Sequence, residues 1–147
     1  MSLLVGEYVP STAAWVRNQV EEYEASGGAR ANTLRGGKDP IVVITSVGRK
    51  SGALRKNPLM RVERGGKYLA VASIGGGPTN PEWYHNFLAN PVVELQDGPE
   101  PRLYRARLLE GAEREDWWAY AVQTWPTYGR YQQKTERQIP IFLLEEV

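Results

Sequence analysis

The feature that most constrains this fold is a run of three β-strand patterns joined by short, glycine-containing turns. Residues 41–47 (IVVITSV) are nearly all β-branched and apolar, which predicts a strand buried on both faces. Residues 54–64 alternate loosely, and residues 67–73 form a third strand pattern after the Gly65-Gly66 turn. A parallel pair needs a crossover of about a dozen residues or more. The run therefore predicts an antiparallel sheet rather than a doubly wound one.

Helical patterns flank this run. Ser11-Thr12 precedes apolar residues at helical spacing, which predicts a capped amphipathic helix that ends at Gly27-Gly28. Asn80 as N-cap and Pro81 at the first helical position predict a second helix. The remaining patterns are strands over 92–96, 102–109 and 139–146 and helices over 113–122 and 127–134. About six mostly antiparallel strands with three or four helices indicate an α+β domain, with the strands closing into a small barrel.

Length and composition limit the organisation and chemistry of the chain. Its 147 residues are enough for one domain, and we expect that domain to span 1–147, with an N-terminal helix and linker over 1–36 and the barrel over 40–147. Without Cys and with one His, the chain has no thiolate nucleophile, and we expect no metal site. No apolar run approaches the ~20 residues of a membrane span, and the N-terminus lacks a secretory pattern, so we expect a cytoplasmic protein.

Charge is strongly segregated along the chain. Residues 30–67 hold ten basic residues and two acidic ones, a net charge of +8, whereas the whole chain carries only +1 and the rest therefore carries −7. Such segregation favours an anionic ligand opposite this segment, although solvated strand faces and turns give the same pattern. The small overall charge argues against a dedicated nucleic-acid binder.

The first candidate site is a glycine-flanked basic turn between the first two strand patterns. Glycines let a backbone approach a ligand closely, and Arg or Lys side chains add charge-assisted hydrogen bonds to an anion. The turn is not a phosphate-binding Walker loop, because the spacing fails and no helix follows. Its candidate ligand-binding residues are Arg49, Lys50, Arg55, Lys56, Asn57 and Pro58.

Two further stretches combine small and aromatic residues. In residues 73–86 a strand end leads through a glycine-rich loop into a helix, where backbone donors favour electron-rich groups. In residues 125–131, Trp125, Tyr128 and Tyr131 recur every three residues, which suits either the wall of a pocket for a flat, partly polar ring or plain core packing.

These stretches resemble the deazaflavin-dependent nitroreductase family of actinobacteria, whose members use coenzyme F420. The resemblance covers the chain from Pro40 to its end, and it rests on residues 47–59 (VGRKSGALRKNPL), 72–86 (ASIGGGPTNPEWYHN), 89–91 (ANP), 128–131 (YGRY) and 137–141 (RQIPI).

The resemblance implies a split β-barrel and a hydride donor, reduced F420 (F420H2). It implies that the basic turn binds the phosphate and polyglutamate tail of the cofactor and that the glycine-rich stretch lines the deazaflavin pocket through Ser73, Ile74, Gly75, Gly76, Trp83 and Tyr84. Tyr128 and Tyr131 match substrate-side tyrosines, and we expect them, with Ser73, to act in catalysis. A fixed hydroxyl donor would stabilise the negative charge that hydride addition leaves on an acceptor oxygen.

The acceptor and the class of protein stay open at this point. The implied activity is reduction of a quinone or an activated enone, which includes xenobiotics. An FMN-dependent split-barrel oxidoreductase and a non-enzymatic F420 carrier are the alternatives. Ile74 stands where the nitroimidazole-activating member has lysine, and Trp125 replaces the first of its three tyrosines, so that activity is not predicted. The oligomeric state and a peripheral membrane contact that would give access to quinone are also left open.

Overall fold

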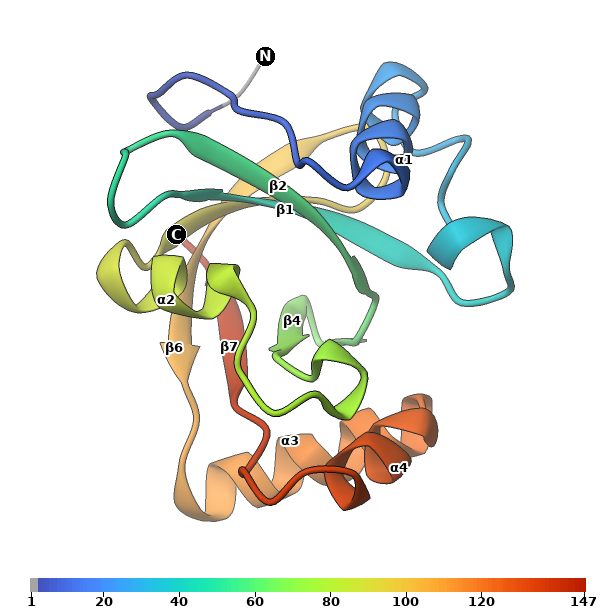
Figure 1. Ribbon diagram of the computed structural model, residues 1–147. Coiled ribbons are helices and arrows are strands. Elements are labelled where there is room, and N and C mark those ends of the chain that lie inside the picture. The colour runs from blue at the N-terminus through green and yellow to red at the C-terminus, as the bar shows by residue number, and fades with distance from the viewer. Residues whose placement is uncertain (1–2) are drawn as a thin grey trace.

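The computed structural model describes residues 3–147, which form a curled antiparallel sheet with helices around it (Figure 1). The strands are β1 (Ile41–Val47), β2 (Leu54–Met60), β3 (Glu63–Arg64), β4 (Lys67–Val71), β5 (Val92–Gln96), β6 (Pro101–Leu108) and β7 (Ile141–Glu146). The helices are α1 (Ala14–Ala25), α2 (Glu82–Ala89), α3 (Gly111–Thr124) and α4 (Thr127–Gln133), with 3₁₀ turns η1 (Leu34–Gly36) and η2 (Ile74–Gly76).

The sheet order is β2-β1-β5-β6-β7-β4-β3, and its pairs are antiparallel. The chain passes from β2 at one edge to β3 at the other through Arg61 and Val62 alone, so the backbone itself draws the two edges together. This crossing splits the strand that the sequence predicts over 54–64, because the chain changes partner there: the Arg61 N–H still donates to the Pro40 carbonyl beside β1, whereas the Val62 carbonyl accepts from Leu69 of β4. The antiparallel barrel of an α+β protein is thus confirmed, with one more strand than expected among the described residues.

The interior of the barrel holds one apolar cluster, into which α2 packs from one end. Alternate residues of β1 and β4, such as Val42 and Ala70, point inward and meet Trp83 and Phe87 of α2 around Phe142. The ring centroids of Phe87 and Phe142 lie 5.3 Å apart in an edge-to-face contact. Burial of these rings fixes the position of α2 relative to β1 and β2.

The outer face of the sheet is covered in two places. Val20 and Tyr23 of α1 pack on Ile41 and Val43, so β1 is buried on both faces as its apolar run predicts. On the other side, α3 and α4 cover β4 and β7, as Figure 1 shows below the barrel. None of the helices in residues 3–147 has the length and apolarity needed to cross a bilayer.

Two predicted helix caps are corrected. Pro81, rather than Asn80, is the N-cap of α2, and the Asn80 side chain instead accepts a hydrogen bond from Arg137. Helix α1 begins after Ala13 without a side-chain cap, and Ser11 Oγ accepts from the Ala13 N–H just outside the helix. In both cases a side chain suited to capping is used by a contact that the local sequence does not reveal.

Candidate functional site

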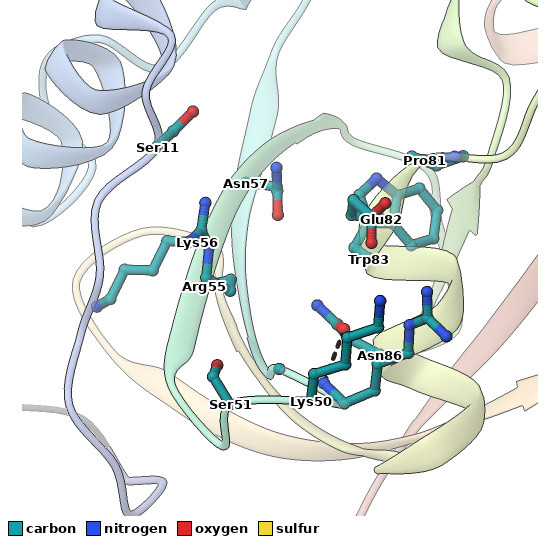
Figure 2. A pocket seen from close by; sticks show the side chains of 12 residues that line it. Ser11, Lys50, Ser51, Arg55, Lys56, Asn57, Pro81, Glu82, Trp83 and Asn86 are labelled. Carbon is teal, nitrogen blue, oxygen red and sulfur yellow. Dashed lines mark hydrogen bonds between the residues drawn. The ribbon is translucent and has the colours of Figure 1, made fainter.

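A cleft runs between β2, the N-terminal end of α2 and α4, and it consists of two cavities that meet at Pro81 and Trp83. The first, of about 380 Å³, is here called the cationic half (Figure 2); it is lined by Ser11, Gly48, Arg49, Lys50, Ser51, Arg55, Lys56, Asn57, Pro81, Glu82, Trp83 and Asn86. The second, of about 280 Å³, is called the aromatic half; it is lined by Trp15, Leu34, Pro58, Leu59, Met60, Val71, Ser73, Ile74, Pro81, Trp83, Tyr128 and Tyr131.

The cationic half presents unpaired positive charge. Arg49 and Lys50 are exposed on the turn after β1, and Arg55 is half-buried on β2. Among the described residues, none of these three side chains forms an ion pair with a carboxylate. Glu82 is the acid in this lining, so cations are in excess. Such a surface suits a ligand with more than one negative charge.

Lys56 also borders the cationic half, but its ammonium is already engaged. Successive residues of a strand point to opposite faces, so Lys56 faces away from Arg55 and Asn57. Its Nζ binds the Glu24 carboxylate of α1 and lies 5.2 Å from the centroid of the Tyr8 ring. Figure 2 shows this side chain directed towards the N-terminal segment and away from Trp83. The Lys56 ammonium is therefore already paired within the protein, and its contact with the cofactor stays a prediction.

Helix α2 holds the basic turn in place through two asparagines. Asn86 is buried, and its Oδ1 accepts the Arg49 N–H at 3.0 Å (Figure 2). The Asn90 side chain donates to the Val47 carbonyl at 3.3 Å. Because α2 is itself anchored in the barrel core, these bonds fix the turn at the mouth of the cleft. Sequence reasoning did not assign Asn86 this role; its place three residues after Trp83, on the inward side of α2, was the available signal.

The aromatic half is uncharged and offers free hydroxyl groups. None of the described side chains in its lining carries a charge. Ser73, Tyr128 and Tyr131 all line it, and within residues 3–147 their hydroxyls have no hydrogen-bond partner. These hydroxyl oxygens are also accessible from the cavity. Among the described side chains, the oxygen that is both fully buried and without a hydrogen-bond partner is Ser46 Oγ, so the unpaired hydroxyls of Ser73, Tyr128 and Tyr131 are not fully buried. The three hydroxyls are thus available as donors to a ligand.

Tyr128 is the most enclosed of these donors. The residue is only 5% exposed, and its ring lies 6.3 Å from that of Tyr131 in an edge-to-face arrangement. Burial raises the pKa of the Tyr128 phenol well above its ordinary value. The phenol therefore stays protonated, and able to donate a hydrogen bond, throughout the neutral and mildly alkaline range.

The glycine-rich loop packs its backbone tightly against α4. Gly76 has φ +82°, and a Cβ at this position would lie 2.7 Å from the Tyr131 carbonyl oxygen. Only glycine fits this combination of a left-handed backbone and a close approach. Gly76 thus sets the distance between η2, which includes Gly75, and the helix that carries Tyr128 and Tyr131.

Two residues singled out in the sequence do not reach the cleft. Tyr84 follows Trp83 on α2 and so points about 100° away around the helix axis. It packs on Phe142, with ring centroids 5.7 Å apart, and borders a separate cavity. Trp125 donates its indole N–H to the Arg61 carbonyl at 3.0 Å and lies outside both halves. Tyr84 is therefore absent from the lining of both halves, and its contact with the cofactor stays a prediction. Trp125 ties α3 to the crossing between β2 and β3.

The N-terminal segment contributes residues that the sequence did not predict. Trp15 of α1 and Leu34 of η1 line the aromatic half, and Ser11 lines the cationic half. The Arg35 guanidinium lies 4.6 Å from the centroid of the Trp15 ring. The sequence places Trp15 on an amphipathic helix, but the docking of that helix beside β2 is a tertiary contact that periodicity does not reveal.

Comparison with known proteins gives one consistent result. A family model described as F420H(2)-dependent quinone reductase matches residues 15–146. An F420H(2)-dependent quinone reductase of Mycobacterium tuberculosis (strain ATCC 25618 / H37Rv) is 33% identical over 111 residues, which make up 74% of each chain.

Solved structures agree. One described as an F420-H2 dependent reductase is 54% identical, with a TM-score of 0.68, and the match covers 72% of this chain and 94% of that one. Another, described as a domain-swapped dimer, is 47% identical, with a TM-score of 0.72, and the match covers 92% of this chain and all of that one (100%). The curled sheet is accordingly a split β-barrel.

Proposed function

Because the chain belongs to the F420H(2)-dependent quinone reductase family, we propose that it reduces a quinone with F420H2, and that its cleft holds both molecules. Family membership makes it an oxidoreductase with reduced F420 as cofactor. Of the alternatives that the sequence left open, family membership favours an F420H2-dependent enzyme over an FMN-dependent oxidoreductase and over a non-enzymatic F420 carrier. The acceptor and the residues that act on it are the proposed part.

The observation that carries the proposal is the change of character along one cleft, from cationic to uncharged and aromatic. F420 has a flat ring at one end and an anionic, phosphate-bearing tail at the other, and this arrangement fits the cleft. Arg49, Lys50 and Arg55 would hold the tail through charge-assisted hydrogen bonds. Trp83, where the halves meet, and the η2 backbone would hold the ring. When bound, F420H2 supplies a hydride.

The protein's own contribution is to orient the acceptor and to stabilise the charge that appears on it. A quinone that gains a hydride acquires negative charge on oxygen, and the free hydroxyls of Ser73, Tyr128 and Tyr131 are the donors available in the aromatic half. Donors that are fixed before the reaction stabilise this charge more than they stabilise neutral substrate. Tyr128 is the best placed of the three for this role, because it is the most enclosed, and a hydrogen bond from an enclosed donor is the least weakened by competing water.

The lining of the aromatic half is largely apolar, and with a quinone bound it would limit the access of water to the reacting atoms. Trp15, Leu34 and Ile74 add apolar surface around the hydroxyl donors. A less polar surrounding strengthens each hydrogen bond to a developing oxyanion. A flat, largely apolar quinone ring would fill this space, and its carbonyl oxygens would be the groups that the hydroxyls recognise.

Anaerobic turnover with a matched acceptor panel tests the proposal. Purified protein would be mixed with F420H2 and either a naphthoquinone or an enone of similar size, and oxidation of the cofactor followed by its absorbance. We expect faster turnover with the quinone, and slower turnover with the same quinone for Tyr128→Phe. Equal or faster reduction of the enone would contradict the assignment of quinone as acceptor. No oxidation with either acceptor would contradict the proposed reaction as a whole.

A further inference from the structure

Arg137, which follows α4, makes an unusual set of contacts for a charged side chain. Its Nε donates to the Gly77 carbonyl at 2.9 Å and its Nη1 to Asn80 Oδ1 at 2.7 Å. Its Nη2 donates to the carbonyls of Ala72 and Ser73, at 3.1 and 2.8 Å. All of these acceptors belong to residues 72–80, the segment that connects β4 to α2 and is here called the connecting loop. One guanidinium thus binds the loop near both of its ends.

These contacts do not form an ion pair. Every acceptor is an uncharged oxygen, and within residues 3–147 no carboxylate pairs with Arg137. Burial lowers the pKa of the guanidinium, in the direction expected for a cation without a compensating charge. Removing such a charge from water is unfavourable unless its donors are satisfied. The rigid, multiply donating geometry of arginine is therefore what the loop uses, and lysine does not reproduce it.

The loop that Arg137 binds is held in a strained conformation. Ile74 has φ +43°, in the left-handed region that a β-branched residue rarely adopts. It is also half exposed, so burial of its side chain does not explain the conformation. A strained backbone of this kind persists only where its surroundings impose it. The bonds from Arg137 to Ala72 and Ser73 on one side, and to Gly77 on the other, are contacts of the required kind.

The connecting loop, with its strained residue Ile74, forms part of the cleft. Ser73 and Ile74 line the aromatic half, and Gly76 sets the spacing to the helix that carries Tyr128 and Tyr131. Arg137 does not line either half of the cleft. Any effect of Arg137 on the cleft is therefore indirect and passes through the connecting loop.

We propose that Arg137 is a positioning residue, which holds the connecting loop in the strained form that lines the cleft and so prepares the surface on which the F420 ring binds. The consequence for F420 rests on the function proposed above. The anchoring of the loop does not, and it can be measured in the protein without cofactor.

The experiment compares Arg137→Gln and Arg137→Lys with Arg114→Gln. Arg114 is a suitable control because it is a buried arginine that donates to the Ile139 carbonyl at 2.6 Å, outside both halves of the cleft. For each protein we would measure amide hydrogen exchange in residues 73–77 without cofactor, the dissociation constant for F420 by fluorescence, and the Tm. Arg137→Lys serves as the milder variant should Arg137→Gln fold poorly.

We expect exchange in residues 73–77 to accelerate by roughly tenfold or more in Arg137→Gln. Its F420 dissociation constant should rise roughly tenfold to a hundredfold, the usual scale for misplacing a pre-organised surface. The KM for F420H2 should rise with it, by more than kcat falls. Arg137→Lys should lie between wild type and Arg137→Gln, and Arg114→Gln should lower the Tm without changing loop exchange or F420 affinity.

Unchanged amide exchange in the loop of both Arg137 variants would overturn the proposal. It would also be overturned if F420 affinity fell only in proportion to the Tm and fell by the same amount in Arg114→Gln, because the loss would then reflect general destabilisation. If wild-type protein failed to bind F420 while loop exchange still responded to Arg137→Gln, the proposed function would fail and the anchoring of the loop would stand.

Discussion

Replacement of Tyr128 by phenylalanine separates a hydroxyl that serves the reaction from a ring that serves the fold. The ring belongs to the apolar cluster under β4 and β7, and phenylalanine keeps that packing. The hydroxyl binds no other group within residues 3–147, so its removal leaves no protein donor or acceptor unpaired. We therefore expect the free energy of unfolding of Tyr128→Phe to stay within about 0.5 kcal/mol of wild type.

The effect on the reaction should be much larger. Loss of one fixed donor to a developing oxyanion costs up to about a thousandfold in kcat, and we expect Tyr128→Phe to lose between about tenfold and a thousandfold. This corresponds to roughly 1.4–4 kcal/mol of transition-state stabilisation. Affinity for F420 should change by no more than about twofold, because the cationic half and Trp83 are untouched.

Tyr120→Phe is the matched control for this substitution. Tyr120 packs against the same cluster, but its hydroxyl donates to the Glu63 carbonyl at 2.7 Å. Its removal should cost about 1 kcal/mol of stability and leave kcat unchanged, the reverse of the pattern at Tyr128. Urea denaturation and anaerobic quinone turnover would measure the two quantities. Wild-type kcat in Tyr128→Phe would refute the reasoning, and solvent would then be the source of the stabilising hydrogen bond.

Three other results are expected from the structure. Arg55→Ala should weaken F420 binding, measured by fluorescence titration, by about 1.5–3 kcal/mol. Lys56→Ala should change F420 binding little, because the Lys56 ammonium is paired with a carboxylate on α1. Equal losses of affinity in the two variants would contradict this difference between the two side chains. Gly76→Ala should lower the free energy of unfolding by about 1–3 kcal/mol more than Gly36→Ala. Both glycines have positive φ, but only a Cβ at Gly76 would contact the α4 backbone. Equal losses in urea denaturation would show that the loop accommodates the added Cβ without strain. Burial and the hydrogen bond to Asp97 raise the pKa of Tyr68, so the folded state keeps this proton at a pH where the unfolded chain has lost it. The free energy of unfolding should therefore fall as the pH rises above about 10. The fall should be smaller in Tyr68→Phe than in wild type, and an identical fall would contradict this assignment.

The fold could be predicted from local patterns where those patterns are strong. The continuous β-branched run of β1 has one interpretation, and the structure confirms it by placing α1 on one face and the barrel core on the other. The short helix over 127–134 is likewise confirmed as α4. The division of the 54–64 strand could not be predicted, because it arises from a change of pairing partner: Arg61 still bonds to Pro40 beside β1, whereas Val62 bonds to Leu69 of β4 at the opposite edge.

The site could be predicted as a set of residue types and not as an arrangement. Charge alone does not distinguish Arg55 from its neighbour Lys56; a strand turns the two to opposite faces, and Glu24 of α1 then pairs with Lys56. The sequence also gives no sign that Trp15 enters the cleft, since that depends on where α1 docks. Arg137 appeared only as part of a matching stretch, because its acceptors lie some sixty residues earlier in the chain.

The central claim is that one cleft binds F420H2 in its cationic half and presents the quinone to it in its aromatic half. A single-turnover experiment tests this most directly: enzyme with bound F420H2 is mixed with a naphthoquinone in the absence of oxygen, and cofactor oxidation and hydroquinone formation are followed together. We predict one equivalent of hydroquinone for each F420H2 oxidised. Arg55→Ala should reduce the fraction of enzyme that reacts, and Tyr128→Phe should slow the reaction of a full fraction. Bound F420H2 that the quinone does not oxidise would contradict the account, as would variants from the two halves that behave alike.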